Sequence, residues 1–170
     1  MTSRDINRPQ KPNLQSNRST DNRPRGNQTE SISRQIINTI SDKNLHEYDI
    51  KILVKQAEEF GRYLKEQNLK TNQIRKFLDA INRIKAQINQ SEFHEQSLRD
   101  HTDSFEDIKV DIVLLKPKLA YAAARQRAVK PLSDVMSVAI DKVYDLKDFE
   151  RLVQMIESII AYHKAAGGEN

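Results

Sequence analysis

The sequence contains no cysteine, which excludes disulfide bridges and thiolate metal sites. It has only four glycines, and none forms the GxGxxG or GxxxxGK[ST] pattern of a nucleotide-binding loop. No apolar run approaches the ~18 residues of a membrane span, and the N-terminus lacks the apolar segment of a secretory signal. We therefore expect a cytoplasmic protein with no cofactor and no membrane contact.

Catalytic patterns are scarce as well. His94 is followed four residues later by Leu98, so the HExxH pattern of a metalloprotease is absent, and no serine has the context of a nucleophile elbow. His94 and His101 lie in a polar, acidic stretch, which leaves a metal-dependent nuclease as one alternative. His163 falls on an apolar stripe and is expected to be a core histidine. We expect no enzyme, no catalytic residue and no metal site.

The net charge of +4 belongs to the first segment of the chain. Residues Met1 to Gln28 hold six basic and two acidic groups and three of the five prolines, whereas residues 29–170 hold 22 of each charge. Apolar residues make up 37% of the chain, and the mean hydropathy is −0.75. A segment this polar does not bury enough surface to fold. The sequence therefore predicts a disordered basic tail over residues 1–28, a loose electrostatic arm for RNA or only a solvating tail, and one domain over residues 29–168.

Apolar residues recur with a helical period throughout this domain, and no segment alternates with a period of two. Thr71 and Asp145 are expected N-caps, Pro131 a first-turn residue, and Gly167-Gly168 a C-cap. We predict an all-α compact bundle of five helices, or six with a break at Pro117. The expected helices are residues 30–41, 48–67, 71–89, 104–126, 131–145 and 145–168, and residues 90–107 form the longest loop.

Basic residues concentrate in two of these helices. Residues 70–85 hold five basic groups and one acid, and residues 112–133 hold five basic groups and no acid. Acids predominate in residues 92–111 and 134–157, so a neutral domain can present one positive and one negative face. On a helix that begins near Pro117, Lys118, Tyr121 and Arg125 share a face, while Leu119, Ala122, Ala123 and Gln126 cover other sides.

Three blocks of the sequence resemble the small subunit of type III-A CRISPR–Csm effector complexes. They are "TNQIRKFLDAINRI", "LLKPKLAYAAAR" and a last helix ending in "IIAYHK". The resemblance covers residues 45–166. It implies a helical bundle without catalytic residues that stacks in several copies beside a filament of backbone subunits and near the large subunit. It also implies that basic residues face the backbone of guide RNA and target RNA.

The resemblance assigns RNA-backbone or neighbour contacts to positions within these blocks. The expected RNA-binding residues are Arg75, Lys76, Arg83, Lys116, Lys118, Tyr121, Arg125 and Arg127. No aromatic-rich platform is present, so binding is expected at phosphates and not at base edges. A helical protein–protein adaptor, whose basic patch meets an acidic partner without touching nucleic acid, remains the alternative.

Overall fold

The computed structural model describes residues 31–95 and 101–168, with side chains for all of these except 90–95, 101–104, 106 and 107. The tail predicted over Met1 to Gln28 lies outside these residues. The elements are α1 (Ile32–Ser41), η1 (Leu45–Glu47), α2 (Ile50–Glu66), α3 (Thr71–Glu95), α4 (His101–Val113), α5 (Leu115–Arg125), η2 (Arg127–Val129), α6 (Lys130–Asp141) and α7 (Leu146–Ala165). Because only Leu114 interrupts α4 and α5, they count as one broken helix, and the predicted all-α bundle is confirmed.

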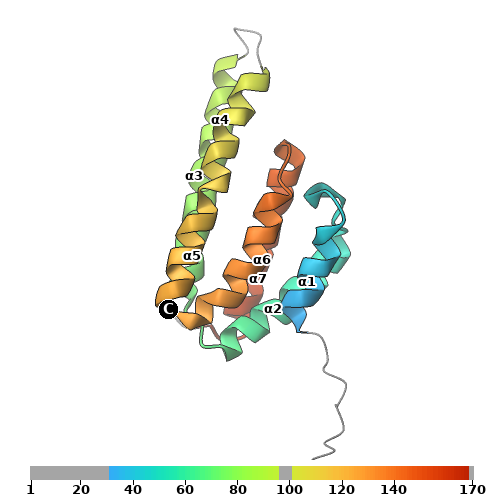
Figure 1. Cartoon of the computed structure of the whole chain (residues 1–170), viewed down its shortest axis with the longest axis vertical. Coiled ribbons are helices and arrows are strands. Elements are labelled where there is room, and N and C mark those ends of the chain that lie inside the picture. Colours follow the sequence, from blue (N-terminus) through green and yellow to red (C-terminus); the bar gives the residue numbers. More distant parts are fainter. Residues whose placement is uncertain (1–30, 96–100, 169–170) are drawn as a thin grey trace, which may run out of the picture.

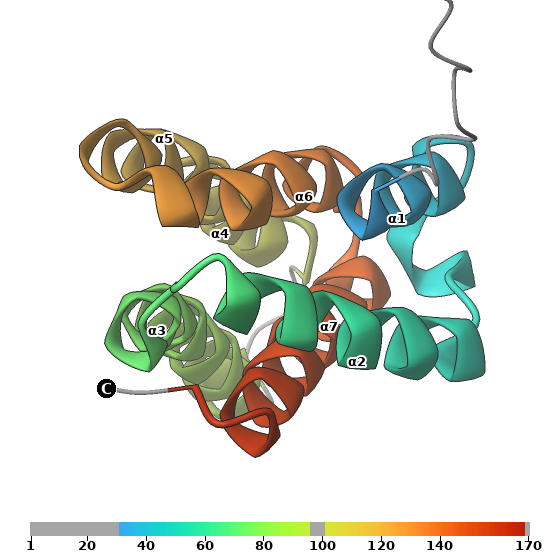
Figure 2. The same ribbon diagram turned by 90° about the horizontal axis from the view of Figure 1, so that it is seen from below.

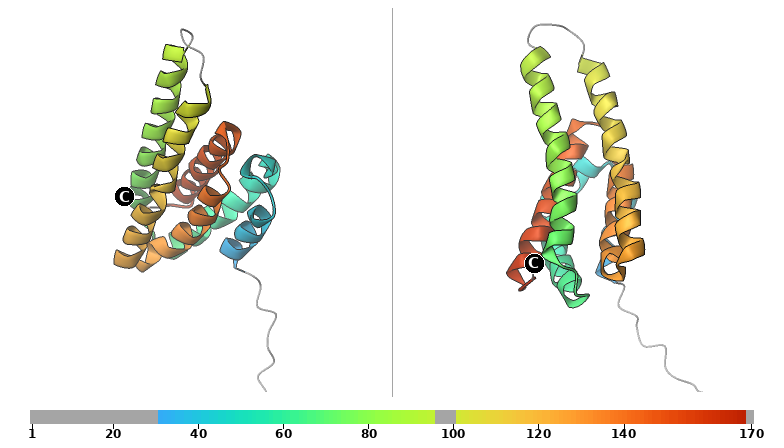
Figure 3. Two further views of the ribbon diagram at one scale, coloured as in Figure 1. Left: turned by 45° about the horizontal axis from the view of Figure 1, so that its top comes forward. Right: turned by 90° about the vertical axis from the view of Figure 1, so that its left-hand side faces the viewer.

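The helices form two groups that share one core. Helix α7 lies between α2 and α3, while α6 packs against α1 and α5 (Figure 2). Helix α3 and the broken helix α4–α5 run antiparallel. The C-terminal end of α3 and the N-terminal end of α4 project beyond the other helices (Figure 1 and Figure 3). None of the helices in the described part of the chain is long and apolar enough to cross a membrane.

The capping and first-turn residues expected at the ends of α6 and α7 lie where the sequence predicts them. Asp145 caps α7 by accepting a hydrogen bond from the Asp148 amide at 2.8 Å, and Pro131 lies in the first turn of α6. After α7, Gly167 has a φ of 86°, and the amides of Gly167 and Gly168 donate to the carbonyls of Lys164 and His163 at 3.0 Å each. This Schellman arrangement favours glycine at position 167, because a residue without a Cβ adopts a positive φ without strain.

Two expectations for this region are wrong. Helix α3 begins at Thr71 as expected, but Thr71 is its first residue and not its N-cap, and the buried Thr71 hydroxyl lies 3.4 Å from His163 Nδ1. The long loop predicted over residues 90–107 is mostly helix, since α3 continues to Glu95 and α4 begins at His101. That stretch is polar but has no glycine or proline to end a helix, and Phe105, Ile108 and Ile112 pack on the core.

Helices α2 and α7 approach closely at Gly61. A Cβ on Gly61 would lie 2.6 Å from the backbone nitrogen of His163 and 2.9 Å from the carbonyl carbon of Tyr162. These are backbone atoms of a buried helix, so neither can move aside without shifting α7. The position therefore requires glycine even though glycine weakens a helix.

We predict that Gly61→Ala destabilises the protein by about 1–3 kcal/mol, because the overpacking penalty exceeds the gain of about 1 kcal/mol in helix propensity. Urea unfolding followed by far-UV circular dichroism measures the change. Glu59→Ala, at an exposed position of the same helix, is the control and should alter the free energy of unfolding by less than about 0.5 kcal/mol. Equal stability of Gly61→Ala and the wild type would contradict the close packing of α2 on α7.

Candidate nucleic-acid interface

A groove of about 500 Å³ runs between the first turns of α3 and the length of α5. Residues from the two basic segments of the sequence, far apart along the chain, line it from opposite sides. Figure 3 shows the helices α3 and α5 that carry them. Its lining residues are Asn72, Gln73, Lys76, Phe77, Ala80, Leu115, Lys118, Leu119, Tyr121, Ala122, Arg125, Gln126, Val129 and Leu132.

Small side chains between the two helices leave the groove open. Ala80 on α3 and Ala122 on α5 present only methyl groups, while Phe77, Leu119 and Val129 are buried beneath them and close the floor. The wall positions follow from helical spacing, since Lys76, Phe77 and Ala80 lie three, four and seven residues after Gln73 along α3. The result is an apolar floor between polar rims.

Three exposed cations lie on the rims of the groove. Lys76 comes from α3, and Lys118 and Arg125 come from α5. None of the three makes an ion pair with a described residue. Tyr121 is 65% exposed beside them, and the Arg125 guanidinium lies 5.6 Å from its ring centroid and donates a hydrogen bond to its hydroxyl at 3.3 Å. The groove therefore offers positive charge that no described acid neutralises.

The groove collects four of the eight residues expected to bind RNA, namely Lys76, Lys118, Tyr121 and Arg125. The other basic candidates lie elsewhere. Lys116 Nζ bonds both Asp141 oxygens at 2.6 and 2.7 Å, which ties α5 to α6. Arg75, Arg83 and Arg127 are exposed and do not line the groove. RNA contact stays a prediction for all eight residues.

Several groove residues were not expected from the sequence. Asn72 and Gln73 on α3 and Gln126 after α5 bring three amide groups to one end of the groove. Gln73 Nε2 donates a hydrogen bond to Gln126 Oε1 and so bridges the two walls. Ala122 and Gln126 had been placed on other sides of the helix from Lys118. Ala122 and Gln126 line the groove because of the face of α5 that α3 approaches. The spacing of residues within α5 alone does not specify that face.

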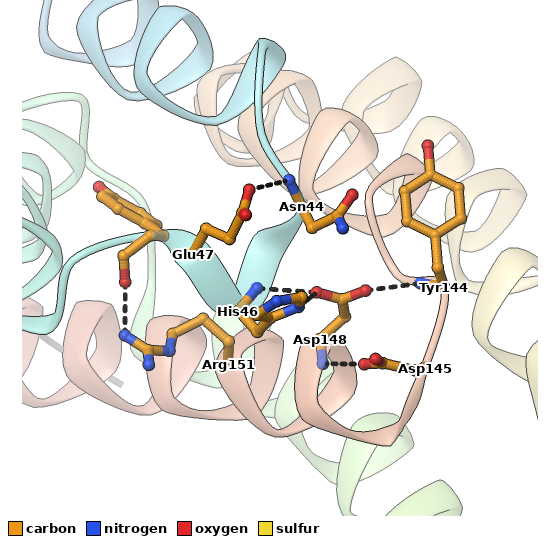
Figure 4. Close-up of polar contacts among 8 residues, drawn as sticks. Asn44, His46, Glu47, Tyr144, Asp145, Asp148 and Arg151 are labelled. Carbon is orange, nitrogen blue, oxygen red and sulfur yellow. Dashed lines mark hydrogen bonds and ion pairs between the residues drawn. The ribbon is translucent and has the colours of Figure 1, made fainter.

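A second polar cluster joins η1 to the start of α7 (Figure 4). The buried Asp148 carboxylate accepts hydrogen bonds from the backbone nitrogen and Nδ1 of His46, both at 2.7 Å, and from the Tyr144 amide at 3.0 Å. Potential metal-binding atoms of His46, Asp145 and Asp148 lie within 4.8 Å of one another. Because Asp148 already accepts three hydrogen bonds and Asp145 caps α7, this cluster is a structural clamp.

Comparison with known families decides what the chain is. A family model described as Csm2 Type III-A matches residues 47–169. The chain belongs to the Csm2 type III-A family. It is thus a small subunit of the multi-subunit Csm complex of CRISPR defence, and the resemblance seen in the sequence is confirmed. No curated protein and no solved structure gives a significant match.

The Csm2 match covers every residue of the groove but begins after α1. It also covers Asp148 and the whole of α7, whereas His46 lies one residue before it. The side chains of His94 and His101, on which the nuclease alternative depends, lie outside the described residues. Members of this family are structural components of the Csm complex, so the family gives that alternative no support.

The contribution of the Asp148 clamp to the free energy of folding depends on pH. Burial alone would raise the pKa of Asp148, but hydrogen bonds from His46 and Tyr144 outweigh burial and hold this pKa below its usual value. A carboxyl whose pKa is lower when folded than when unfolded stabilises the fold above its unfolded pKa. That contribution is lost as the pH falls from about 4 through the folded pKa.

We predict that Asp148→Asn destabilises the protein by about 2–4 kcal/mol at neutral pH, because it removes a buried, hydrogen-bonded charge. Unfolding curves at pH 7 and below pH 4 should show the gap to the wild type shrinking in acid. Asp145→Asn removes the same charge nearby but keeps an N-cap, so it serves as the control with a smaller effect. A gap that is independent of pH would show that the Asp148 charge is not what stabilises the clamp.

Proposed function

We propose that this Csm2 protein is a non-catalytic, RNA-binding and scaffolding subunit that holds the sugar-phosphate backbone of guide RNA and target RNA along the α3–α5 groove. The observation that carries the proposal is the convergence of Lys76, Lys118 and Arg125, from two helices, on one groove, where none of them forms an ion pair with a described acid. Phosphates attract such cations whatever the base sequence is, so the guide can supply the specificity.

The scaffolding part of the proposal rests on other surfaces. Val110, Val113 and Leu114, at the junction of α4 and α5, are 60%, 50% and 48% exposed. Neighbouring large apolar side chains of this kind suit a contact with another protein subunit. The proposed protein partners are the backbone and large subunits of the complex and neighbouring copies of this chain, in the cytoplasm.

The balance of acidic and basic residues outside the tail supports stacking of copies. Residues 29–170 carry equal numbers of acids and bases, so copies placed head to tail do not repel one another through net charge. A head-to-tail contact that does not close into a ring produces an open array. Such an array would extend the grooves of successive copies along one bound RNA.

We predict that Lys118→Ala/Arg125→Ala weakens binding of an unrelated single-stranded RNA and lowers the slope of log K against log salt by about 1.4, or about 0.7 for each lost phosphate contact. Fluorescence anisotropy of the full chain across a salt series measures both effects. Lys51→Ala/Lys55→Ala removes the same charge from exposed positions of α2, away from the groove, and should leave the slope near that of the wild type.

The same measurement separates RNA binding from the adaptor alternative. An unchanged slope for Lys118→Ala/Arg125→Ala would refute the groove as a phosphate site. If only a chain lacking Met1 to Gln28 lost the salt dependence, the tail would be the RNA-binding element. The basic face of α5 would then be assigned to a protein contact.

A further inference from the structure

The α3–α5 groove has more apolar surface than phosphate binding requires. Its accessible apolar surface includes the half-buried Ala80 and Ala122, whereas Phe77, Leu119 and Val129 beside them are only 6%, 3% and 3% exposed. A sugar-phosphate chain is polar and charged along its whole length, and gains nothing from an apolar floor. The rim cations therefore account for only part of the surface that the groove presents.

The volume and the mixed lining match a site for a small, partly aromatic group. About 500 Å³ lies within the range of about 300–1,000 Å³ that small-molecule pockets occupy. Tyr121 adds an aromatic ring that is 65% exposed at the rim. A nucleobase has an apolar face that stacks on such surfaces, and it is joined to the phosphates that the rim cations attract.

Side-chain amide groups at one end of the groove can form hydrogen bonds with the edge of a base. Asn72 and Gln126 are exposed at one end of the groove, and apart from the hydrogen bond that Gln126 Oε1 accepts from Gln73, their side chains make no hydrogen bond to the described residues. Each amide offers both a donor and an acceptor, which is the pattern that base edges require. An apolar side chain of a protein partner would leave these groups, and the three rim cations, without use.

We infer that the α3–α5 groove binds an unpaired nucleobase of single-stranded RNA, with the base over the apolar floor and its adjoining phosphates at Lys76, Lys118 and Arg125. The inference rests on the proposed function and adds a contact that reaches the base itself. It revises the expectation that only phosphates are recognised. In this arrangement Ala122 is an essential small residue, because a larger side chain there would occupy the space of the base.

The test compares two probes with the full chain. One is a short single-stranded RNA of mixed sequence, and the other is an abasic ribose-phosphate chain of the same length. The wild type should bind the base-bearing RNA about tenfold more tightly, the effect expected for one base stacked on protein. Ala122→Leu should reduce this preference to about twofold or less, because it weakens binding of the base-bearing RNA more than binding of the abasic chain.

Ala124→Leu is the matched control, because Ala124 is exposed on the same helix and does not line the groove. It should keep the wild-type preference. If Ala122→Leu fails to fold, as judged by circular dichroism, Ala80→Leu fills the groove from α3, with exposed Ala86→Leu as its control.

The results distinguish this inference from the proposed function. Equal affinity of the wild type for both probes would overturn the base site, and so would a preference that survives in Ala122→Leu. In either case, a salt slope that still depends on Lys118 and Arg125 would leave the phosphate site intact. Absence of binding to both probes would overturn the phosphate site and the base site together.

Discussion

The hydrogen bond between the buried His163 ring and the Leu69 carbonyl fixes where α3 begins. Nε2 and the carbonyl oxygen are 2.8 Å apart, and because a carbonyl only accepts, Nε2 carries the proton. Burial lowers the pKa of His163, which keeps the ring neutral, and Gly168 folds back against it without a Cβ. The last helix thus holds the turn from which the basic wall of α3 starts.

The groove depends on both of its walls being held by the core in this way. His163 positions the start of α3, and the Lys116–Asp141 ion pair, together with buried Leu119, holds α5 against α6. The rim cations are therefore carried by helices and not by mobile loops. A rigid surface of this kind would present the same geometry to RNA in every copy, which the proposed stacking of Csm2 subunits requires.

Local features of the fold could be predicted from the sequence, whereas features that depend on how helices pair could not. Asp145, Pro131 and Gly167 act through their own backbone neighbours, and their positions were predicted correctly. The helix predicted from residue 104 is confirmed, whereas the helical residues 90–95 and 101–103 fall in the predicted loop, because this polar stretch has few apolar residues at helical spacing. Lys118, Tyr121 and Arg125 were correctly placed on one face. That Asn72 and Gln73 lie opposite them follows from tertiary packing, which no spacing within one helix reveals.

Photo-crosslinking of single-stranded RNA to the full chain, followed by mass spectrometry of the crosslinked peptides, tests the central claim most directly. The chain has five tyrosines, and only Tyr121 lines the groove, while Tyr144, between α6 and α7, is 54% exposed and serves as an internal control. If RNA binds in the α3–α5 groove, an adduct should form at Tyr121 and none at Tyr144. Crosslinks at Tyr144, or only within Met1 to Gln28, would contradict it.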